Sequence, residues 1–348
     1  MVAAGDSGRQ LPRINEGRKH QRDNSTKHWS IVNRILFFGL AVGASLLWFV
    51  ASRIDISLIR AELARADLSY LLLAVCALAA AFAVKALRWA QLMPQPRSFR
   101  WHHLLYPVVV GNAGNAIVPH SGELLRTALV NRKWNVQYTT SLTSIAMERM
   151  FDFLSVGAVS LSIFFNGELS GPLATALRFI AAGFALLLVV FFVLIARPDV
   201  CMQILRWLTR PFPIRFADVV DREFQTVINT LQALRGGHLL IRITTLSLLQ
   251  WLLIGTSIYL CIEAVGVNVP LAVAAGVLLL TVAGLTLPTA PGYVGTIQVC
   301  FLIGMSGFSS EDQAIAASVL YNFVVTVPVI IPAVPAFVNL NLWRRRQN

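Results

Sequence analysis

Long uninterrupted apolar blocks are the feature of this sequence that most restricts its fold. A helix needs roughly 20 apolar residues to cross a hydrocarbon core about 30 Å thick. The blocks that reach this length are residues 31–50, 69–92, 139–165, 172–196, 239–262 and 313–341. Because a bilayer core offers the backbone no hydrogen-bond partners, such blocks must be helical. The sequence therefore predicts an all-α polytopic membrane protein with about six full transmembrane helices.

The composition agrees with this class and argues against others. Apolar residues make up 56% of the chain and charged residues only 13%, whereas soluble domains carry about 25% charge. The blocks and their short connections use almost all of the chain after residue 30, so we expect no soluble catalytic domain of about 100–150 residues. The cysteines have no paired spacing and no nucleotide-binding motif is present. We therefore predict no disulfide, no metal and no cofactor.

Two further apolar regions contain residues that break helices. Region 103–118 includes a run of glycine and asparagine and is followed by Pro119. Region 270–305 is interrupted between Pro288 and Gly295. Proline removes a backbone donor and glycine weakens a helix. Broken backbone survives at membrane depth only where protein or a water-filled cavity surrounds it, so we predict two re-entrant broken helices.

Basic residues predict the orientation of the chain, because lysine and arginine gather in cytoplasmic segments. The tail 1–30, the loop 197–238 and the tail 344–348 all lie on one side if region 103–118 enters and leaves by the same face. We therefore place both termini in the cytoplasm and the protein in the inner membrane. The tail 1–30 is expected to be disordered, and residues 31–343 are expected to form one transmembrane domain. The net charge of +12 then reflects topology rather than binding to nucleic acid.

The predicted order of segments contains an internal symmetry. The halves 31–165 and 172–341 each read as two spans, a re-entrant segment and a last span, in opposite orientations. This is an inverted-topology repeat, which is common in secondary transporters. It follows from charges and helix breakers, not from identity between the halves. In the second half, apolar residues at helical spacing over 220–234 predict an amphipathic helix on the inner membrane face.

Charged residues lie inside the predicted spans, where each costs about 2.5–3.5 kcal/mol on insertion and is usually functional. Glu148 and Asp152 are four residues apart and share one helical face, with Arg149 beside them. Lys85 and Arg88, near the inner end of span 69–92, are further cations that could neutralise these carboxylates. Two interpretations remain open, a charge network that locks helices together and a polar cavity.

A second polar cluster follows the first break. Glu123 lies in the first turn of a short predicted helix, and Arg126 shares its face three residues on. Glu123 therefore either caps the helix, where its dipole favours an anion, or belongs to an anion site beside the break. Asn112 and Asn115 add neutral polar contacts in the break itself.

The third cluster is the break in region 270–305. Gly292 and Gly295 permit tight turns, and Pro291 cannot continue a helix. Tyr293 supplies a phenol and Gln298 an amide. The break either serves folding alone or lines a substrate site together with the first two clusters.

The order of these motifs resembles the flippase-like, lysylphosphatidylglycerol-synthase transmembrane-region proteins. The resemblance covers roughly residues 30–340. It rests on the motifs Gly122-Glu123-Leu124-Leu125-Arg126, Glu148-Arg149-x-x-Asp152 and Pro288-x-x-Pro291-Gly292-x-x-Gly295. The chain departs from the family at two places. It has His120-Ser121 just before the Gly-Glu pair, where the family often has a basic residue, and Gln298 after the last glycine, where the family often has a glutamate. Some relatives append an aminoacyltransferase domain; this chain ends at Asn348, so we expect no synthase activity.

The resemblance implies handling of a lipid with a polar headgroup. The leading prediction is a lipid transporter or flippase, and not an enzyme, that moves a phospholipid, a hopanoid or a polyprenyl-linked lipid between leaflets. One alternative is a membrane-embedded transferase acting on a lipid-linked donor, and another is a non-catalytic accessory subunit of a lipid or envelope pathway. The expected partners are membrane lipids and proteins of lipid biosynthesis, and no nucleic acid.

Overall fold

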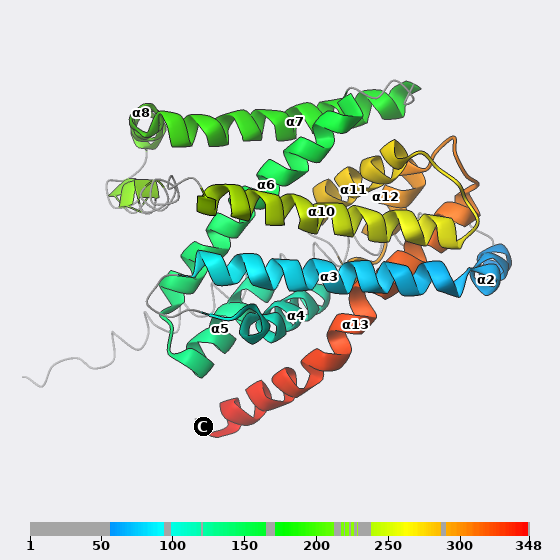
Figure 1. The fold of residues 1–348 in the computed structure, drawn as a ribbon, viewed down its shortest axis with the longest axis horizontal. Helices are drawn as coiled ribbons and strands as arrows, with labels where there is room; N and C mark the ends of the chain where they lie inside the picture. The colour runs from blue at the N-terminus through cyan, green and yellow to red at the C-terminus, as the bar shows by residue number, and fades with distance from the viewer. Residues whose placement is uncertain are drawn as a thin grey trace, which may run out of the picture.

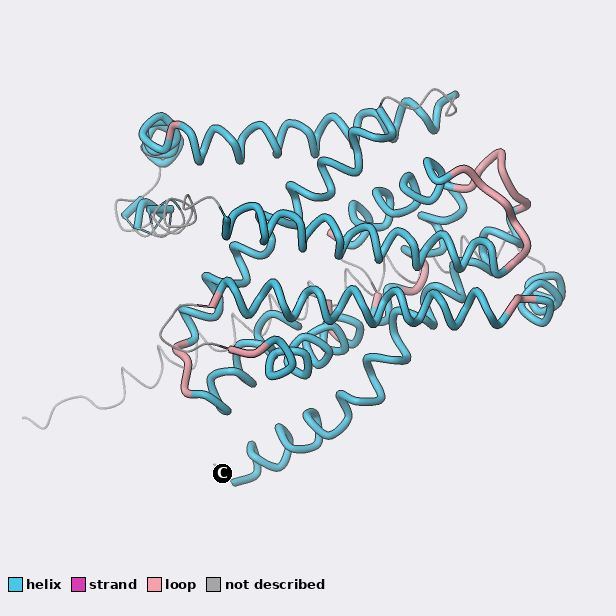
Figure 2. Tube along the Cα trace, viewed as in Figure 1, coloured by secondary structure: helices cyan, strands magenta, loops and turns pink. Residues whose placement is uncertain are grey.

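The computed structural model describes residues 56–93, 99–119, 121–164, 171–211, 238–286 and 290–346, together with parts of 217–228. These ranges are helical and contain no β-strand. The predicted first span, 31–50, and the predicted tail, 1–30, lie outside the described residues. Short loops join the helices (Figure 2).

The helices are given in chain order. They are α2 (Ile56–Arg65), α3 (Leu68–Leu92), α4 (Trp101–Ile117), α5 (Gly122–Trp134), α6 (Tyr138–Phe164), α7 (Gly171–Ala196), α8 (Pro198–Thr209), α10 (His238–Ala264), α11 (Leu271–Leu285), the 3-10 turn η1 (Pro291–Tyr293), α12 (Thr296–Gly304) and α13 (Glu311–Arg346).

Three described helices are long and apolar enough to cross a membrane. They are α3, α10 and the part of α13 from Glu311 to Ala336, and they match the predicted spans 69–92, 239–262 and 313–341. The predicted spans 139–165 and 172–196 form the helices α6 and α7. The protein is thus an all-helical, multi-pass membrane protein, while the total of six spans stays a prediction.

The helices α3 and α10 pack side by side along the long axis of the molecule, and α13 crosses behind them (Figure 1). The main apolar core lies where α3, α10, α11, α12 and α13 meet. The helices α7 and α8 lie at one edge, and α6 runs obliquely from them to α5 (Figure 1). This arrangement brings the middle of α6 against α3, α5 and α10.

The first predicted break forms a tight helical hairpin of α4 and α5. The helix α4 continues through the glycine–asparagine run to Ile117, so the break begins later than predicted. Asn112 helps the helix continue, because its amide donates to the Val108 carbonyl one turn earlier. The hairpin is closed by glycine: a Cβ on Gly122 would lie 2.1 Å from the Gly111 carbonyl oxygen.

The second predicted break forms another hairpin, of α11 and α12. Gly284 near the end of α11 packs on Thr296 at the start of α12, and Gly304 at the end of α12 packs on Val277. Between them, Gly292 turns the chain with φ 72°, a conformation open to glycine at no steric cost. Both hairpins exist, whereas their entry into the membrane from opposite faces as an inverted repeat stays a prediction.

The first part of the loop 197–238 forms a helix, whereas the sequence predicted a helix only over 220–234. The helix α8 begins with Pro198 at its first turn, a position that proline favours, and it was not predicted. Its side chains Ile204 and Trp207 are exposed, so α8 is itself amphipathic. The helix predicted over 220–234 falls largely outside the described residues.

Candidate functional site

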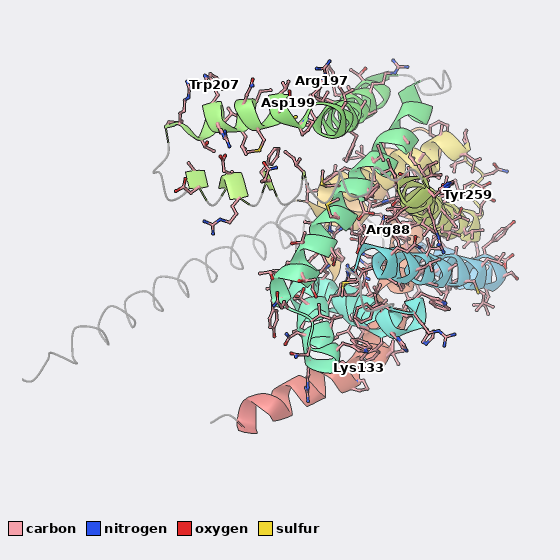
Figure 3. The ribbon with its side chains drawn as sticks, turned by 60° about the vertical axis from the view of Figure 1, so that its left-hand side comes forward. Arg88, Lys133, Arg197, Asp199, Trp207 and Tyr259 are labelled. Atoms are coloured by element: carbon pink, nitrogen blue, oxygen red, sulfur yellow. The ribbon has the colours of Figure 1, made fainter. Side chains whose placement is uncertain are left out.

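Three helices bring seven charged side chains into one cluster, which we call the charge network. It consists of Lys85 and Arg88 from α3, Glu123 and Arg126 from α5, and Glu148, Arg149 and Asp152 from α6. The sequence placed these residues in two separate clusters, and the fold merges them. Figure 3 shows Arg88 in the interior of the helix bundle.

Glu148 is the centre of the network and is fully buried. Nη2 of Arg126 lies 2.7 Å from Oε2 of Glu148, and Nη1 donates to Oε1 at 3.3 Å. Nζ of Lys85 and Nη2 of Arg88 each lie 3.4 Å from Oε1. One carboxylate is therefore surrounded by three cations, which offsets the large cost of burying it.

Asp152 connects the network to a fourth helix, α10. Nη1 of Arg88 lies 2.8 Å from Oδ1 of Asp152, and the indole N–H of Trp251 donates to the same oxygen at 3.1 Å. Arg88 also donates to the hydroxyl of Ser247 at 2.6 Å. Sequence reasoning missed Ser247 and Trp251, although their four-residue spacing places both on one face of α10.

Arg149 pairs mainly with Glu123, to which its guanidinium donates a hydrogen bond. Its distance to Asp152 is longer, 3.7 Å. Of the two carboxylates that Arg149 was expected to neutralise, it pairs with Asp152 and not with the adjacent Glu148, because adjacent residues on a helix point in different directions. The side chain of Arg149 is 43% exposed and that of Glu123 is 22% exposed. This pair is the accessible end of the network.

Arg126 turns away from Glu123 and into the bundle, contrary to the expectation that it shares a face with that carboxylate. Its guanidinium lies 4.0 Å from the ring centroid of Trp89, and the Trp89 indole donates to Ser144 at 2.9 Å. Gly111 leaves room for this path, because a Cβ there would lie 2.5 Å from Cγ of Arg126. The α4–α5 hairpin therefore determines where Arg126 points.

The network has unused binding capacity. It holds four cations and three carboxylates, so one positive charge has no acidic counterpart within it. Nε of Arg88 and Nε of Arg126 are buried and have no hydrogen-bond partner within the described structure. Oε2 of Glu123 is also buried without a partner there. Unpaired buried polar groups are costly, so the network is suited to an added anion.

The other predicted site residues mainly serve the backbone. Asn115 accepts from the backbone N–H of Gly122 at 2.6 Å, and Gln298 accepts from that of Gly295 at 2.7 Å. Each amide oxygen therefore has one of its two acceptor lone pairs occupied by the backbone. Pro291 and Gly292 form the turn η1. The Gly292 carbonyl accepts from Asn322 of α13 at 2.9 Å.

Tyr293 links the second hairpin to the network. Its phenol lies within the electrostatic influence of Glu123 and Arg149, and η1 packs against α4. The two hairpins thus meet at the accessible end of the network. Within the described residues, no group of three or more His, Cys, Asp or Glu side chains is placed to hold a metal ion.

Comparison with known proteins gives a family and a relative. The family described as "Lysylphosphatidylglycerol synthase TM region" matches residues 36–333. The glycosyltransferase AglD of Haloferax volcanii is 25% identical over 273 residues, which cover 68% of this chain and 43% of that protein. The chain thus spans less than half the length of this curated relative.

These comparisons correct one expectation from the sequence. We expected a protein that is not an enzyme, because its apolar blocks leave no room for a soluble catalytic domain. That expectation is wrong: the relative is named a glycosyltransferase, and the family description names a synthase. A chain dominated by membrane helices can still belong with enzymes, because charged side chains can gather inside the bundle. With almost all of its described helices inside the matched range, the chain belongs to the lysylphosphatidylglycerol synthase TM-region family.

Proposed function

We propose that this protein is a membrane-embedded transferase that acts on a lipid-linked donor, and that the charge network binds the phosphate of that donor. The observation that carries the proposal is the excess of one cation in a buried network with unpaired guanidinium N–H groups. The likeness to a glycosyltransferase supports transfer as the reaction class.

The chemistry of the network suits a phosphate better than a neutral sugar. Arginine presents N–H groups in a planar fork that matches phosphate oxygens, and such charge-assisted bonds are strong. The half-exposed Arg149 is placed to meet the phosphate first, while Arg126 and Arg88 extend the positive potential inward. Because the donor's tail is apolar, its headgroup can reach this depth while the tail remains in lipid.

Glu123 is the residue best placed to act as a base. One of its oxygens is held by Arg149 and the other has no partner within the described residues. In the proposed reaction, an acceptor hydroxyl attacks the transferred group and gives its proton to Glu123. The bond between that group and the donor phosphate breaks, and the electron pair stays on the phosphate oxygen. The new negative charge is stabilised by the cations of the network.

The test is transfer by the purified full chain in proteoliposomes containing radiolabelled polyprenyl-phosphate sugars. We expect a labelled product from the wild-type protein. Glu123→Gln should bind donor but form no product, because a neutral amide cannot take the proton. Arg149→Gln should weaken donor binding. Arg206→Gln is the matched control, because Arg206 pairs with Asp221 outside the network, and it should behave as wild type. Absence of product with every donor would contradict the proposal.

Movement of a lipid between leaflets is the second candidate, and one observation favours it. Two helical hairpins meet at the charge network, and paired broken helices at a central site are typical of secondary transporters. A leaflet-accessibility assay in the same liposomes separates the two functions. Movement without a covalent product supports transport, whereas product that forms only from donor in one leaflet supports transfer alone.

The orientation and partners of the protein belong to the same proposal. We infer from the basic tail 1–30, the basic loop 197–238 and the basic tail 344–348 that both termini lie at the cytoplasmic face of the inner membrane. Its partners are membrane lipids and proteins of lipid biosynthesis, and no nucleic acid. Accessibility of a cysteine introduced at Asn135 tests the orientation, since labelling from outside would contradict it.

A further inference from the structure

A pocket of about 340 Å³ lies at the opposite end of the α4–α5 hairpin from the charge network. Its lining includes His103 and Tyr106 from α4, Leu129, Lys133 and Trp134 from α5, and Ala336 from α13. Lys133 is seven residues beyond Arg126, which corresponds to about 10 Å along the helix. The pocket is therefore separate from the network.

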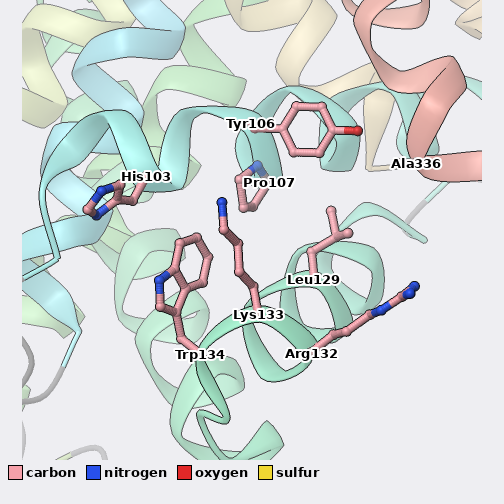
Figure 4. Close-up of a pocket in the computed structure, with 8 residues that line it drawn as sticks. All are labelled: His103, Tyr106, Pro107, Leu129, Arg132, Lys133, Trp134 and Ala336. Atoms are coloured by element: carbon pink, nitrogen blue, oxygen red, sulfur yellow. The ribbon is translucent and has the colours of Figure 1, made fainter. Parts of the chain in front are cut away.

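The pocket is basic. Arg132 and Lys133 are exposed, and neither forms an ion pair with any described residue. The ammonium of Lys133 lies 4.8 Å from the Trp134 ring centroid and points between that ring and Pro107 (Figure 4). No carboxylate is among the lining residues. An anion in this pocket would meet cations without displacing an internal partner.

An imidazole borders the pocket on α4. Desolvation and the nearby groups His102, Lys133 and Arg100 lower the pKa of His103, which lies in the first turn of α4. The lowered pKa favours the neutral imidazole, so the positive charge of the pocket comes from α5. The ammonium of Lys133 points into the concave space, whereas the guanidinium of Arg132 extends away from it at the rim (Figure 4).

The remaining lining is apolar and aromatic, as at a membrane–water boundary. Tyr106 is 43% exposed, and the Trp134 ring packs edge-on against Phe99 with a centroid distance of 5.6 Å. Tryptophan and tyrosine concentrate at headgroup level. Leu129 and Ala336 offer an apolar wall at the base. A ligand that contacts both the basic residues and the apolar lining of this pocket would carry a phosphate and an apolar chain.

We propose that this basic pocket binds the phosphate of an anionic membrane lipid, as a second lipid site distinct from the charge network. Basic pockets between helices on the cytoplasmic side are suited to phosphate headgroups. The same chemistry would accept a soluble phosphate ester, so the experiment compares the two sources. The inference does not rest on the proposed transfer reaction, because it needs only binding.

The test is native mass spectrometry of the full chain from nanodiscs of phosphatidylcholine that contain phosphatidylglycerol. We expect retained phosphatidylglycerol on the wild-type protein. The double variant Arg132→Gln/Lys133→Gln should bind it roughly thirtyfold more weakly, from the usual contribution of a cation near an anionic surface. The matched control Arg197→Gln/Arg242→Gln removes two exposed arginines elsewhere and should leave binding unchanged.

Three outcomes would overturn the proposal. Equal binding by the double variant and the wild type would show that the pocket is not the site. An equal loss of phosphatidylglycerol binding in the control variant would show that binding depends only on the net charge of the protein. Displacement of the lipid by soluble glycerol phosphate would assign the pocket to a soluble ester. If the double variant loses its wild-type melting temperature, Arg132→Lys/Lys133→Arg replaces it, and binding by this charge-preserving variant must then persist.

Arg149→Gln separates the two sites within the same experiment. This substitution changes the accessible end of the charge network and leaves the pocket intact. We expect its phosphatidylglycerol binding to equal that of the wild type even where transfer is lost. Loss of phosphatidylglycerol binding in Arg149→Gln would contradict the existence of a separate site.

Discussion

The two ends of the charge network differ in burial and therefore in what they can do. At the inner end, Glu148 is fully buried and contacts three cations from two other helices. At the outer end, Arg149 pairs with Glu123 and, at 3.7 Å, with Asp152, and its side chain is 43% exposed. Buried pairs cost several kcal/mol to break, whereas exposed pairs contribute about 0–1 kcal/mol. The inner end thus holds the helices together, and the outer end is free to bind.

The sequence left two interpretations of these charges open, a network that locks helices together and a polar cavity. The difference in burial indicates that each applies to a different part of the charge network. A structural lock describes Glu148 with Arg88 and Arg126, because these groups satisfy one another out of solvent. The proposed binding function concerns Arg149 and Glu123, whose side chains are partly exposed and include an unpaired carboxylate oxygen. A charge exposed at membrane depth would be costly against hydrocarbon. We therefore infer that the outer end faces a polar space.

The largest effect is expected at the inner end. Glu148→Gln should lower the free energy of unfolding by about 3–5 kcal/mol, because it leaves Lys85 and Arg126 buried without a carboxylate, while Arg88 keeps its pair with Asp152. Thermal unfolding in detergent measures this loss. The double variant Glu148→Gln/Arg126→Met should regain part of it, since it removes one of the stranded charges. A Glu148→Gln protein with wild-type stability would contradict the role of the inner end.

The glycine contacts of the α4–α5 hairpin test whether both ends of the charge network depend on this hairpin. Gly122→Ala places a Cβ 2.1 Å from the Gly111 carbonyl oxygen, which backbone atoms cannot accommodate without moving apart. We expect a loss of about 1–3 kcal/mol in unfolding free energy, together with loss of transfer. Gly183→Ala is the control, because a Cβ there meets nothing within 4 Å. Equal stability of the two variants would show that the hairpin is not tightly closed.

The link to α10 should have a smaller effect. Trp251→Phe removes the hydrogen bond to Asp152 and keeps an aromatic ring in place. Hydrogen bonds to charged groups contribute about 1.5–3 kcal/mol, and Arg88 still pairs with Asp152, so we expect a loss near the lower limit. Thermal unfolding again measures it. A loss of unfolding free energy as large as that of Glu148→Gln would show that Asp152, and not Glu148, contributes most to the stability of the charge network.

The smallest effect on stability is expected at the outer end. Arg149→Gln should change the free energy of unfolding by less than about 1 kcal/mol, because the side chain is substantially exposed. Its effect on donor binding should nevertheless be large. Measuring both quantities on one preparation sharpens the contrast between the ends. A strongly destabilised Arg149→Gln protein would merge the two ends into one structural unit.

The sequence predicted the components of the site better than their pairing. Charges inside apolar blocks identified Glu148, Arg149 and Asp152, and the helix breaks identified both hairpins. Two partners of Glu148, Lys85 and Arg88, were predicted and are found beside it. The pairing with Arg126 was not, because Arg126 reaches Glu148 only through the packing of α5 against α4 at Gly111. Pairing between helices depends on tertiary geometry, which a single sequence does not determine.

Two other features of the structure were not predicted from the sequence, for different reasons. Trp251 and Ser247 are ordinary residues for an apolar helix, and only their spacing on one face hints at a polar neighbour. The second feature is the helix α8. Proline is common in the first turn of a helix, so its start at Pro198 is typical, but α8 is too short to be recognised as a membrane span. The long apolar blocks of α3, α10 and α13 were predictable because bilayer thickness fixes their length.

The most direct test of this account is donor transfer by Glu123→Gln and Arg149→Gln proteins whose melting temperatures are measured alongside. The account predicts that Arg149→Gln melts within a few degrees of the wild type, since this change costs less than about 1 kcal/mol, and that Glu123→Gln still folds, because the amide keeps the shape of this partly buried side chain. It also predicts that neither transfers the group from a polyprenyl-phosphate donor. Full transfer by either well-folded variant would contradict the claim that the accessible end of the charge network is the site of function.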